Sequence, residues 1–251
     1  MVAAPARTAG PPGSTVLPLA IFDLDNTLLG GDSDYLWGQF LVERGIVDHE
    51  YYERENERFY RDYHAGRLDI GVFLRFALQP LAAHPLPALH AWREDFLREK
   101  IEPVILPAAR ALVEHHRAAG DLLLLITATN AFVTAPIAER FGIPHLIATD
   151  PEQVDGRYTG EVAGTPAFRE GKVRRLEAWL AQTGHGLAGS TFYSDSHNDI
   201  PLLDRVDHPV AVDPDPQLLA YAQQRGWPVM SLRPTGGPSS SAGSAARGSG
   251  P

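Results

Sequence analysis

The stretch AIFDLDNTLLGG, residues 20–31, places two acids, Asp23 and Asp25, directly after an apolar run. A continuous apolar run of this length is typical of a strand that is buried on both faces, as in a parallel sheet. An acid at the end of a strand is usually only a turn residue. The pair therefore indicates a functional site only if other parts of the chain bring matching groups to the same place.

Further apolar runs of strand length recur along the chain. They are VLPLAIF (16–22), LLLLI (122–126), HLIAT (145–149), STFY (190–193) and PVAV (209–212). Helical patterns alternate with these runs, at residues 107–120, 130–142 and 171–184. The second helix contains Pro136, which we expect to kink it or shift its start. The alternation predicts an α/β fold with a doubly wound, mostly parallel sheet.

Residues 33–105 break this alternation, because they carry helical patterns and no strand-like run. They lie between the first strand and the next helix–strand unit. We therefore predict a helical cap domain inserted into a core made of residues 16–32 and 106–232. The terminal segments 1–15 and 233–251 are rich in small residues and proline, and we expect them to be disordered tails.

Composition narrows the class of protein. The chain of 251 residues has a net charge of −9, which argues against a nucleic-acid partner, since such proteins present a basic face. It has no cysteine, which excludes disulfides and thiolate metal sites. No apolar stretch approaches the roughly 20 residues that span a bilayer, and the N-terminus is not a convincing secretion signal. We expect a cytoplasmic protein with no membrane partner, and the oligomeric state stays open.

Polar groups follow three of the predicted strands. Asp23, Thr127 and Asp195 each come at or just after the end of an apolar run, and the ends of parallel strands share one edge of a sheet. Lys172 stands at the start of a helical pattern, from which it can reach the same edge. Carboxylates, a hydroxyl and an ammonium group together suit a phosphoryl group and Mg²⁺, which prefers oxygen ligands.

These residues carry a family resemblance. DLDNT (23–27), Thr127 within ITATN, Lys172 within REGKV and SDSHND (194–199) resemble, in this order, the four motifs of the haloacid dehalogenase superfamily. The position of the insert is similar to the helical C1 cap of the phosphoserine-phosphatase-like branch, subfamily IB. GRYTGEV (156–162) resembles a short hairpin of that branch. The resemblance implies a Rossmann-like core and a phosphatase that acts on a small phosphate monoester.

The resemblance also implies catalytic roles. Asp23 would attack phosphorus to form an aspartyl-phosphate, and Asp25 would protonate the leaving alkoxide and then activate water. Thr127 and Lys172 would bind phosphate oxygens, and Asn198 would touch the phosphate or brace its loop. As an alternative, Lys172 would be a solvated lysine at a helix start.

For the metal, the resemblance implies Mg²⁺ bound by the carboxylates of Asp23 and Asp195 and by the backbone carbonyl of Asp25. Asp199 would act beside these ligands or through a water, and it could also cap the following helix. His197 is expected to pack the loop, because Mg²⁺ disfavours imidazole.

Two positions bear on the substrate: one matches the phosphoserine phosphatases and the other differs from them. Asp32 stands where phosphoserine phosphatases bind the substrate amine with an acid, although it could simply cap a helix. Ala77 stands where they bind the substrate carboxylate with an arginine, and Arg67 and Arg75 are close substitutes. An amino alcohol phosphate fits this pattern better than phosphoserine does.

The chain also resembles a bacterial subgroup, with DLDNTLL, GDSD, TATN and FREGK, that includes histidinol-phosphate phosphatases. L-Histidinol phosphate is therefore the first candidate and phosphoserine the second. A phosphotransferase and a non-catalytic phosphate-binding protein remain alternatives. A dehalogenase is disfavoured, because it needs neither Asp25 nor the DSHND cluster.

Overall fold

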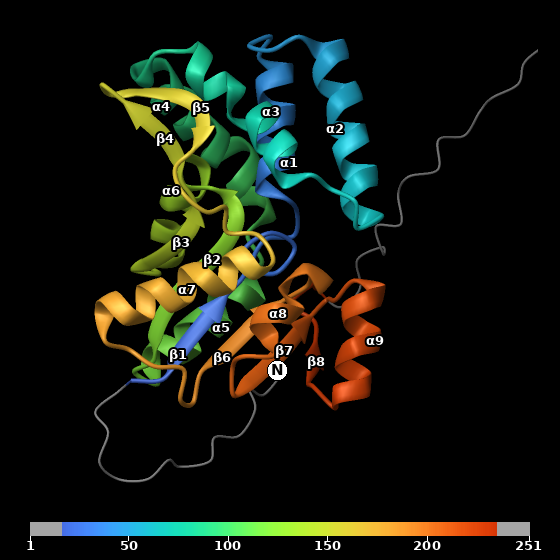
Figure 1. The fold of residues 1–251 in the computed structure, drawn as a ribbon, viewed down its shortest axis with the longest axis vertical. Helices are drawn as coiled ribbons and strands as arrows, with labels where there is room; N and C mark the ends of the chain where they lie inside the picture. Colours follow the sequence, from blue (N-terminus) through green and yellow to red (C-terminus); the bar gives the residue numbers. More distant parts are fainter. Residues whose placement is uncertain (1–16, 235–251) are drawn as a thin grey trace, which may run out of the picture.

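The computed structural model describes residues 17–234, and a six-stranded parallel sheet forms its centre (Figure 1). In spatial order the strands are β3 (His145–Thr149), β2 (Leu122–Asn130), β1 (Leu19–Phe22), β6 (Thr191–Ser194), β7 (His208–Val212) and β8 (Val229–Met230). Ile21 pairs with Leu124 on one side and with Phe192 on the other. The strand order reverses beside β1, the place where open α/β sheets bind ligands.

Helices cover both faces of the sheet, as the fold prediction requires. Successive side chains of a strand point to opposite faces. Ala20 and Phe22 therefore lie in one apolar cluster with α5 (Pro107–Ala118) and α6 (Ala131–Phe141). Leu19 and Ile21 lie in a second cluster with the helices of the other face, which are α7 (Glu170–Thr183), α8 (Ile200–Leu203) and α9 (Pro216–Arg225). In Figure 1, α7 crosses in front of the strands.

Helix α6 keeps its expected start despite its internal proline. Asn130 caps it, with Oδ1 accepting from the backbone N–H of Val133 at 3.2 Å. Pro136 lacks the N–H that would bond the carbonyl of Phe132 one turn earlier. Nη1 of Arg93 donates to that carbonyl at 2.9 Å instead. Of the two effects expected of Pro136, a shift of the helix start does not occur, and a donor from another helix bonds the carbonyl that the proline leaves without its usual partner.

The segment 33–105 is helical, as predicted. Its elements are α1 (Ser33–Glu43), α2 (His49–His64), α3 (Ile70–Ala83), α4 (Leu86–Phe96), a π-helical turn η1 (Leu97–Ile101) and a 3₁₀ turn η2 (Glu102–Val104). At its base, Leu29 forms an antiparallel bridge with Ile105, and the backbone N–H of Gly30 donates to the carbonyl of Val104 at 2.7 Å. This neck lies at the boundaries that we propose for the cap. Within residues 17–234, no helix is long and apolar enough to cross a membrane.

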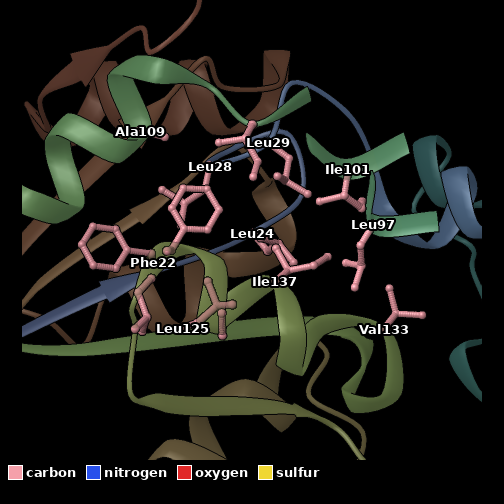
Figure 2. Packing of buried hydrophobic residues seen from close by; sticks show 14 of the residues in the cluster. Phe22, Leu24, Leu28, Leu29, Leu97, Ile101, Ala109, Leu125, Val133 and Ile137 are labelled. Atoms are coloured by element: carbon pink, nitrogen blue, oxygen red, sulfur yellow. The ribbon is translucent and has the colours of Figure 1, made fainter. Parts of the chain in front are cut away.

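The base of the insert shares the core of the sheet. Figure 2 shows Leu97 and Ile101 of the insert in the same apolar cluster as Phe22 and Leu24. A separate cluster, built around Tyr52, Phe59 and Phe76, joins α2 to α3. The insert thus has a base packed on the sheet, to which α3 contributes Leu78 and Leu81, and an outer part where α2 packs on α3 around a small core of its own.

The short hairpin expected between the second and third motifs is present. It consists of β4 (Pro151–Val154) and β5 (Arg157–Val162), which pair in antiparallel fashion. Asp155 and Gly156 form its turn with φ of 51° and 74°, the left-handed conformation that favours such tight hairpins. The hairpin lies against α3, where Gly160 faces the side chain of Ala82. The predicted tails, 1–15 and 233–251, lie outside the described residues except for residues 233 and 234.

Candidate active site

The predicted phosphate and metal residues meet at one edge of the sheet. Asp23 directly follows β1, Asp195 directly follows β6, and Thr127 lies in the last half of β2. Lys172, in the first turn of α7, is only 4% exposed, and its Nζ lies 2.7 Å from Oδ1 of Asp23. A Cβ on the preceding residue, Gly171, would lie 2.1 Å from the carbonyl oxygen of Pro166. The glycine therefore lets α7 begin close enough for Lys172 to reach the site.

One hydroxyl connects the proposed nucleophile with a proposed metal ligand. Oγ1 of Thr27 lies 3.2 Å from Oδ2 of Asp23 and 3.1 Å from Oδ1 of Asp195, and it accepts from the backbone N–H of Asp195. Burial raises the pKa of Asp23 to about 7, although the nearby Lys172 opposes this change. Two acids, Asp23 buried and Asp195 half-buried, thus converge on a single hydroxyl donor.

Asp25 sits in a different environment from Asp23. Its Oδ1 accepts from the backbone N–H of Ser33 at 2.7 Å, and its Oδ2 accepts from Oγ1 of Thr129 at 2.8 Å and of Thr127 at 3.4 Å. Burial raises the pKa of Asp25 to about 6, and the nearby Asp32 adds to this. A carboxyl group that gains and loses a proton near neutral pH suits acid–base catalysis.

Asp199 is engaged with the site lysine. Its Oδ2 accepts from Nζ of Lys172 at 2.8 Å and from Oγ of Ser194 at 2.7 Å. Its side chain makes no capping bond to α8. Burial opposes the charge on Lys172, but Asp199 and Asp23 outweigh burial, and the pKa of Lys172 is raised. The lysine is therefore held as a fixed cation between two carboxylates.

The loop 194–199 is braced from two sides. Oδ1 of Asn198 accepts from Nε of Arg169 at 2.7 Å, and its Nδ2 lies 3.3 Å from Oγ of Ser196. Nδ1 of His197 lies 2.6 Å from Oδ2 of Asp215, which also accepts from the backbone N–H of His197. These contacts show loop packing for both motif residues. Sequence reasoning missed Arg169 and Asp215. Arg169 could have been noticed only because it lies three residues before Lys172, and Asp215 only because it caps a helix.

The proposed amine ligand does cap a helix. Oδ1 of Asp32 accepts from the backbone N–H of Tyr35 at 2.9 Å, and the side chain is otherwise exposed. The backbone N–H of Asp34 also interacts with this carboxylate and, like that of Tyr35, favours its ionised form. Asp34, which the sequence analysis did not select, is half-buried beside it and accepts from Nδ2 of Asn130.

The departure at Ala77 lies on α3, in the outer part of the insert. Ala77 is half-buried, whereas Arg75, its proposed substitute, is exposed. The other proposed substitute, Arg67, is exposed and pairs with Asp62 at 3.5 Å. Among residues 17–234, neither arginine forms a hydrogen bond or ion pair with the acids of the site, so neither is placed to replace the arginine that phosphoserine phosphatases have at the position of Ala77.

The oxygen atoms at the sheet edge fit a magnesium ion. Among residues 17–234, no three acidic or histidine side chains are gathered as metal ligands. The carboxylates that the family resemblance proposes as ligands, those of Asp23 and Asp195, lie on either side of the hydroxyl of Thr27 at 3.2 and 3.1 Å. Burial and Asp23 raise the pKa of Asp195 well above its usual value. A cation between these two acids would relieve this cost, and with the backbone carbonyl of Asp25 the donors are all oxygen.

The comparison with known proteins is decisive for the family. The model of the haloacid dehalogenase-like hydrolases matches residues 20–204. The chain belongs to this family. This haloacid dehalogenase-like hydrolase is 49% identical over 219 residues to a histidinol-phosphatase of Neisseria meningitidis, covering 86% of the chain and 99% of that relative. It is 32% identical over 239 residues to phosphoserine phosphatase SerB1 of Mycobacterium tuberculosis, covering 92% and 77%.

Solved structures agree with the fold. A protein of unknown function from Bordetella pertussis superposes with a TM-score of 0.83 at 51% identity, covering 87% of this chain and all of that one. A phosphoserine phosphatase, with a phospho-aspartyl intermediate analogue, superposes with a TM-score of 0.63 at 18% identity, covering 87% and 95%. The haloacid dehalogenase-like hydrolase is a phosphatase with a parallel sheet and a helical insertion.

Proposed function

We propose that the protein is a Mg²⁺-dependent phosphatase that hydrolyses L-histidinol phosphate through an aspartyl-phosphate. One observation carries the reaction: Asp23, at the end of the central strand, lies 2.7 Å from the buried ammonium of Lys172. Asp25, two residues on, has its own set of hydrogen-bond donors. The proposed nucleophile, Asp23, and the proposed acid, Asp25, are thus held by different hydrogen-bond partners although they are only two residues apart in the sequence.

In the first half of the reaction, a carboxylate oxygen of Asp23 forms a bond to phosphorus while the ester P–O bond breaks. Asp25, protonated, gives its proton to the departing alkoxide oxygen. Lys172 and Thr127 hold the equatorial phosphate oxygens, and Asp199 keeps the ammonium group in place. When bound, Mg²⁺ would offset the negative charges that the nucleophile and the phosphate bring together.

In the second half, Asp25 is a carboxylate and takes a proton from a water molecule. The water oxygen bonds to phosphorus, the bond between phosphorus and the oxygen of Asp23 breaks, and inorganic phosphate leaves. Both acids then return to their first state. The raised pKa of Asp25 serves both halves, because the group must be protonated in one and ionised in the other.

The choice of substrate rests on the relative and on the insert. A histidinol-phosphatase shares 49% of its residues with this chain over nearly its whole length. We place the amine of the substrate at Asp32, on the neck of the cap formed by residues 33–105. Ala77 offers no group for a substrate carboxylate, which L-histidinol phosphate lacks and phosphoserine has.

The test is phosphate release from L-histidinol phosphate and phosphoserine, with Mg²⁺ and with EDTA, by the native chain and by Asp23→Asn. We expect Mg²⁺-dependent release that favours L-histidinol phosphate and is lost in the variant. A preference for phosphoserine would instead support the activity named for the relative with 32% identity. Transfer of phosphate to added alcohols in place of water would indicate a phosphotransferase. Turnover that persists in Asp23→Asn would rule out the proposed nucleophile.

A further inference from the structure

A closed ring of hydrogen bonds joins the outer part of the insert to the loop 194–199. On one side, the hydroxyl of Tyr63, in the last turn of α2, lies 2.9 Å from Oγ of Ser196. On the other, Nη2 of Arg169 donates to the carbonyl of Gly66 at 3.4 Å. The backbone N–H of Gly66 donates to the carbonyl of Tyr63 at 3.0 Å, which joins the two sides within one turn of chain. In Figure 1, α2 runs down toward the region of α8 and α9.

The ring closes inside the loop. Oγ of Ser196 accepts from the backbone N–H of Asn198 at 3.2 Å and from its Nδ2 at 3.3 Å. Oδ1 of Asn198 then accepts from Nε of Arg169 at 2.7 Å. Ser196 and Asn198 are 7% and 5% exposed, so these bonds have little competition from water.

The backbone of Arg169 supports a specific role for this residue. Arg169 has φ of 50° and ψ of −123°, a conformation that residues other than glycine rarely adopt. Such strain persists only where the surroundings hold it. Here the guanidinium group is held by Asn198 and Gly66, and it lies over the ring of Phe168 at 5.0 Å.

The ring residues alternate with acids of the site. Ser196 follows Asp195, and Asn198 precedes Asp199, which fixes the site lysine. We propose that Tyr63 and Arg169 are positioning residues. They hold the turn between α2 and α3 against the loop 194–199, and this contact fixes the geometry of the loop, which carries the proposed Mg²⁺ ligand Asp195. The cap then not only encloses the substrate but also orders the loop that carries Asp195. The role of the loop in binding Mg²⁺ rests on the proposed function.

The first test uses hydrogen exchange of the metal-free full-length protein, which needs neither activity nor metal. We expect Tyr63→Phe to speed the exchange of amides in 194–199 about fivefold, the size expected from the loss of one hydrogen bond. Amides of β1 should not change. Tyr60→Phe, one turn earlier on the exposed side of α2, is the matched control and should leave the loop unchanged. Equal exchange in native protein and Tyr63→Phe would overturn the proposal.

The second test is the concentration of Mg²⁺ that gives half-maximal activity. We expect it to rise about fivefold in Tyr63→Phe and in Arg169→Gln, with less change in KM for the ester. Arg169→Lys should recover part of the loss, because an ammonium group can still donate to Asn198. Arg174→Gln, an exposed change on the same helix, is the control.

A double variant separates coupling from general damage. If the ring acts as one unit, Tyr63→Phe combined with Ser196→Ala should exchange no faster than Ser196→Ala alone. Effects that simply add would contradict the proposal. A protein without any phosphatase activity would refute the proposed function, yet the exchange experiment would still decide whether the ring orders the loop.

Discussion

Thr129 is one of the residues that hold the proposed acid, Asp25, and it offers the sharpest test at a single position. Its hydroxyl donates to Oδ2 of Asp25 at 2.8 Å. A hydrogen bond to a charged group contributes about 1.5–3 kcal/mol, so we expect Thr129→Val to lower kcat by roughly tenfold or more. The loss should be greater for alkyl esters than for p-nitrophenyl phosphate, whose leaving group needs no proton.

The same variant has a predicted pH dependence. The bond from Thr129 favours the ionised form of Asp25 and so lowers its pKa, against burial, which raises it to about 6. Without this bond the pKa rises further, and Asp25 is ionised only at higher pH. The acidic limb of kcat, where Asp25 must take a proton from water, should therefore move to higher pH. A limb that stays in place would contradict this, and Thr159→Val, on exposed β5, is the control.

Asp32 allows charge and helix capping to be tested apart. Asparagine caps helices about as well as aspartate does, so Asp32→Asn should leave the bond to Tyr35 and the start of α1 intact. If the charge binds the substrate amine, KM for L-histidinol phosphate should rise about tenfold, in the range of one charge-assisted hydrogen bond. KM for p-nitrophenyl phosphate, which has no amine, should not change. Equal changes for both esters would leave Asp32 with its capping role alone.

At this scale the sequence indicated the proposed reacting groups but not the residues that position them. That Asp23, Lys172 and Asp195 meet at one edge of the sheet could be predicted, because their spacing to strand ends and helix starts is local. Thr129 and Arg169 could not, because their partners are distant in the sequence and depend on how β2 and α7 are placed. A threonine in a strand and an arginine before a helix look ordinary until the fold is known.

At the scale of elements, Arg93 completes a helix to which it does not belong. It lies on α4 and donates to the carbonyl of Phe132, which Pro136 leaves without its usual donor in α6. Its guanidinium group also lies 4.6 Å from the centre of the ring of Phe132. We expect Arg93→Met to lower the free energy of unfolding by about 1–3 kcal/mol, measured by urea denaturation.

A second substitution, Pro136→Ala, tests whether Arg93 stabilises the protein through the carbonyl of Phe132. In Pro136→Ala the backbone N–H returns and can bond the carbonyl of Phe132 directly. Arg93→Met should then cost clearly less in the Pro136→Ala background than in the native chain. Equal costs in both backgrounds would show that Arg93 acts through packing rather than through this carbonyl.

Element prediction succeeded where burial left a strong pattern. The five apolar runs predicted five strands of the sheet, because strands buried on both faces read as continuous apolar runs. Strand β8 was missed because it has only two residues, and β4 because its polar residues lie on an exposed hairpin. The start of α6 at its Asn130 cap was predicted correctly, but the donor that compensates for Pro136 was not, because it comes from a helix about forty residues away.

At the scale of the whole molecule, the insert and the sheet share one core at the base of the cap. Leu97 and Ile101 pack with Phe22, whereas Tyr52 and Phe76 pack within the outer part. The base cannot move without opening the main core, and α3 also contributes Leu78 and Leu81 to that core, so motion of the cap should be greatest in α2. This division could not be read from the sequence, since both parts have the same helical periodicity.

The buried acids of the site lower the free energy of unfolding of the whole molecule. We therefore expect loss of one of them to change the melting temperature in opposite directions without and with metal. Burial and Asp23 raise the pKa of Asp195, so its ionised form is disfavoured in the folded state at neutral pH. Asp195→Asn removes one of these two charges. Without metal, the variant should therefore melt about 2–4 °C higher than the native protein, as expected for a gain near 1 kcal/mol in a chain of this size.

With metal, the order should reverse. Mg²⁺ that binds only the folded state stabilises it by about 2.7 kcal/mol at a hundred times its dissociation constant. The native chain should therefore melt higher as Mg²⁺ is added, while Asp195→Asn should not, because one proposed ligand is missing. Calorimetry of both proteins with EDTA and with Mg²⁺ measures each arm. A native melting temperature that Mg²⁺ does not change, or a variant that gains as much as the native chain, would remove Asp195 from the metal site.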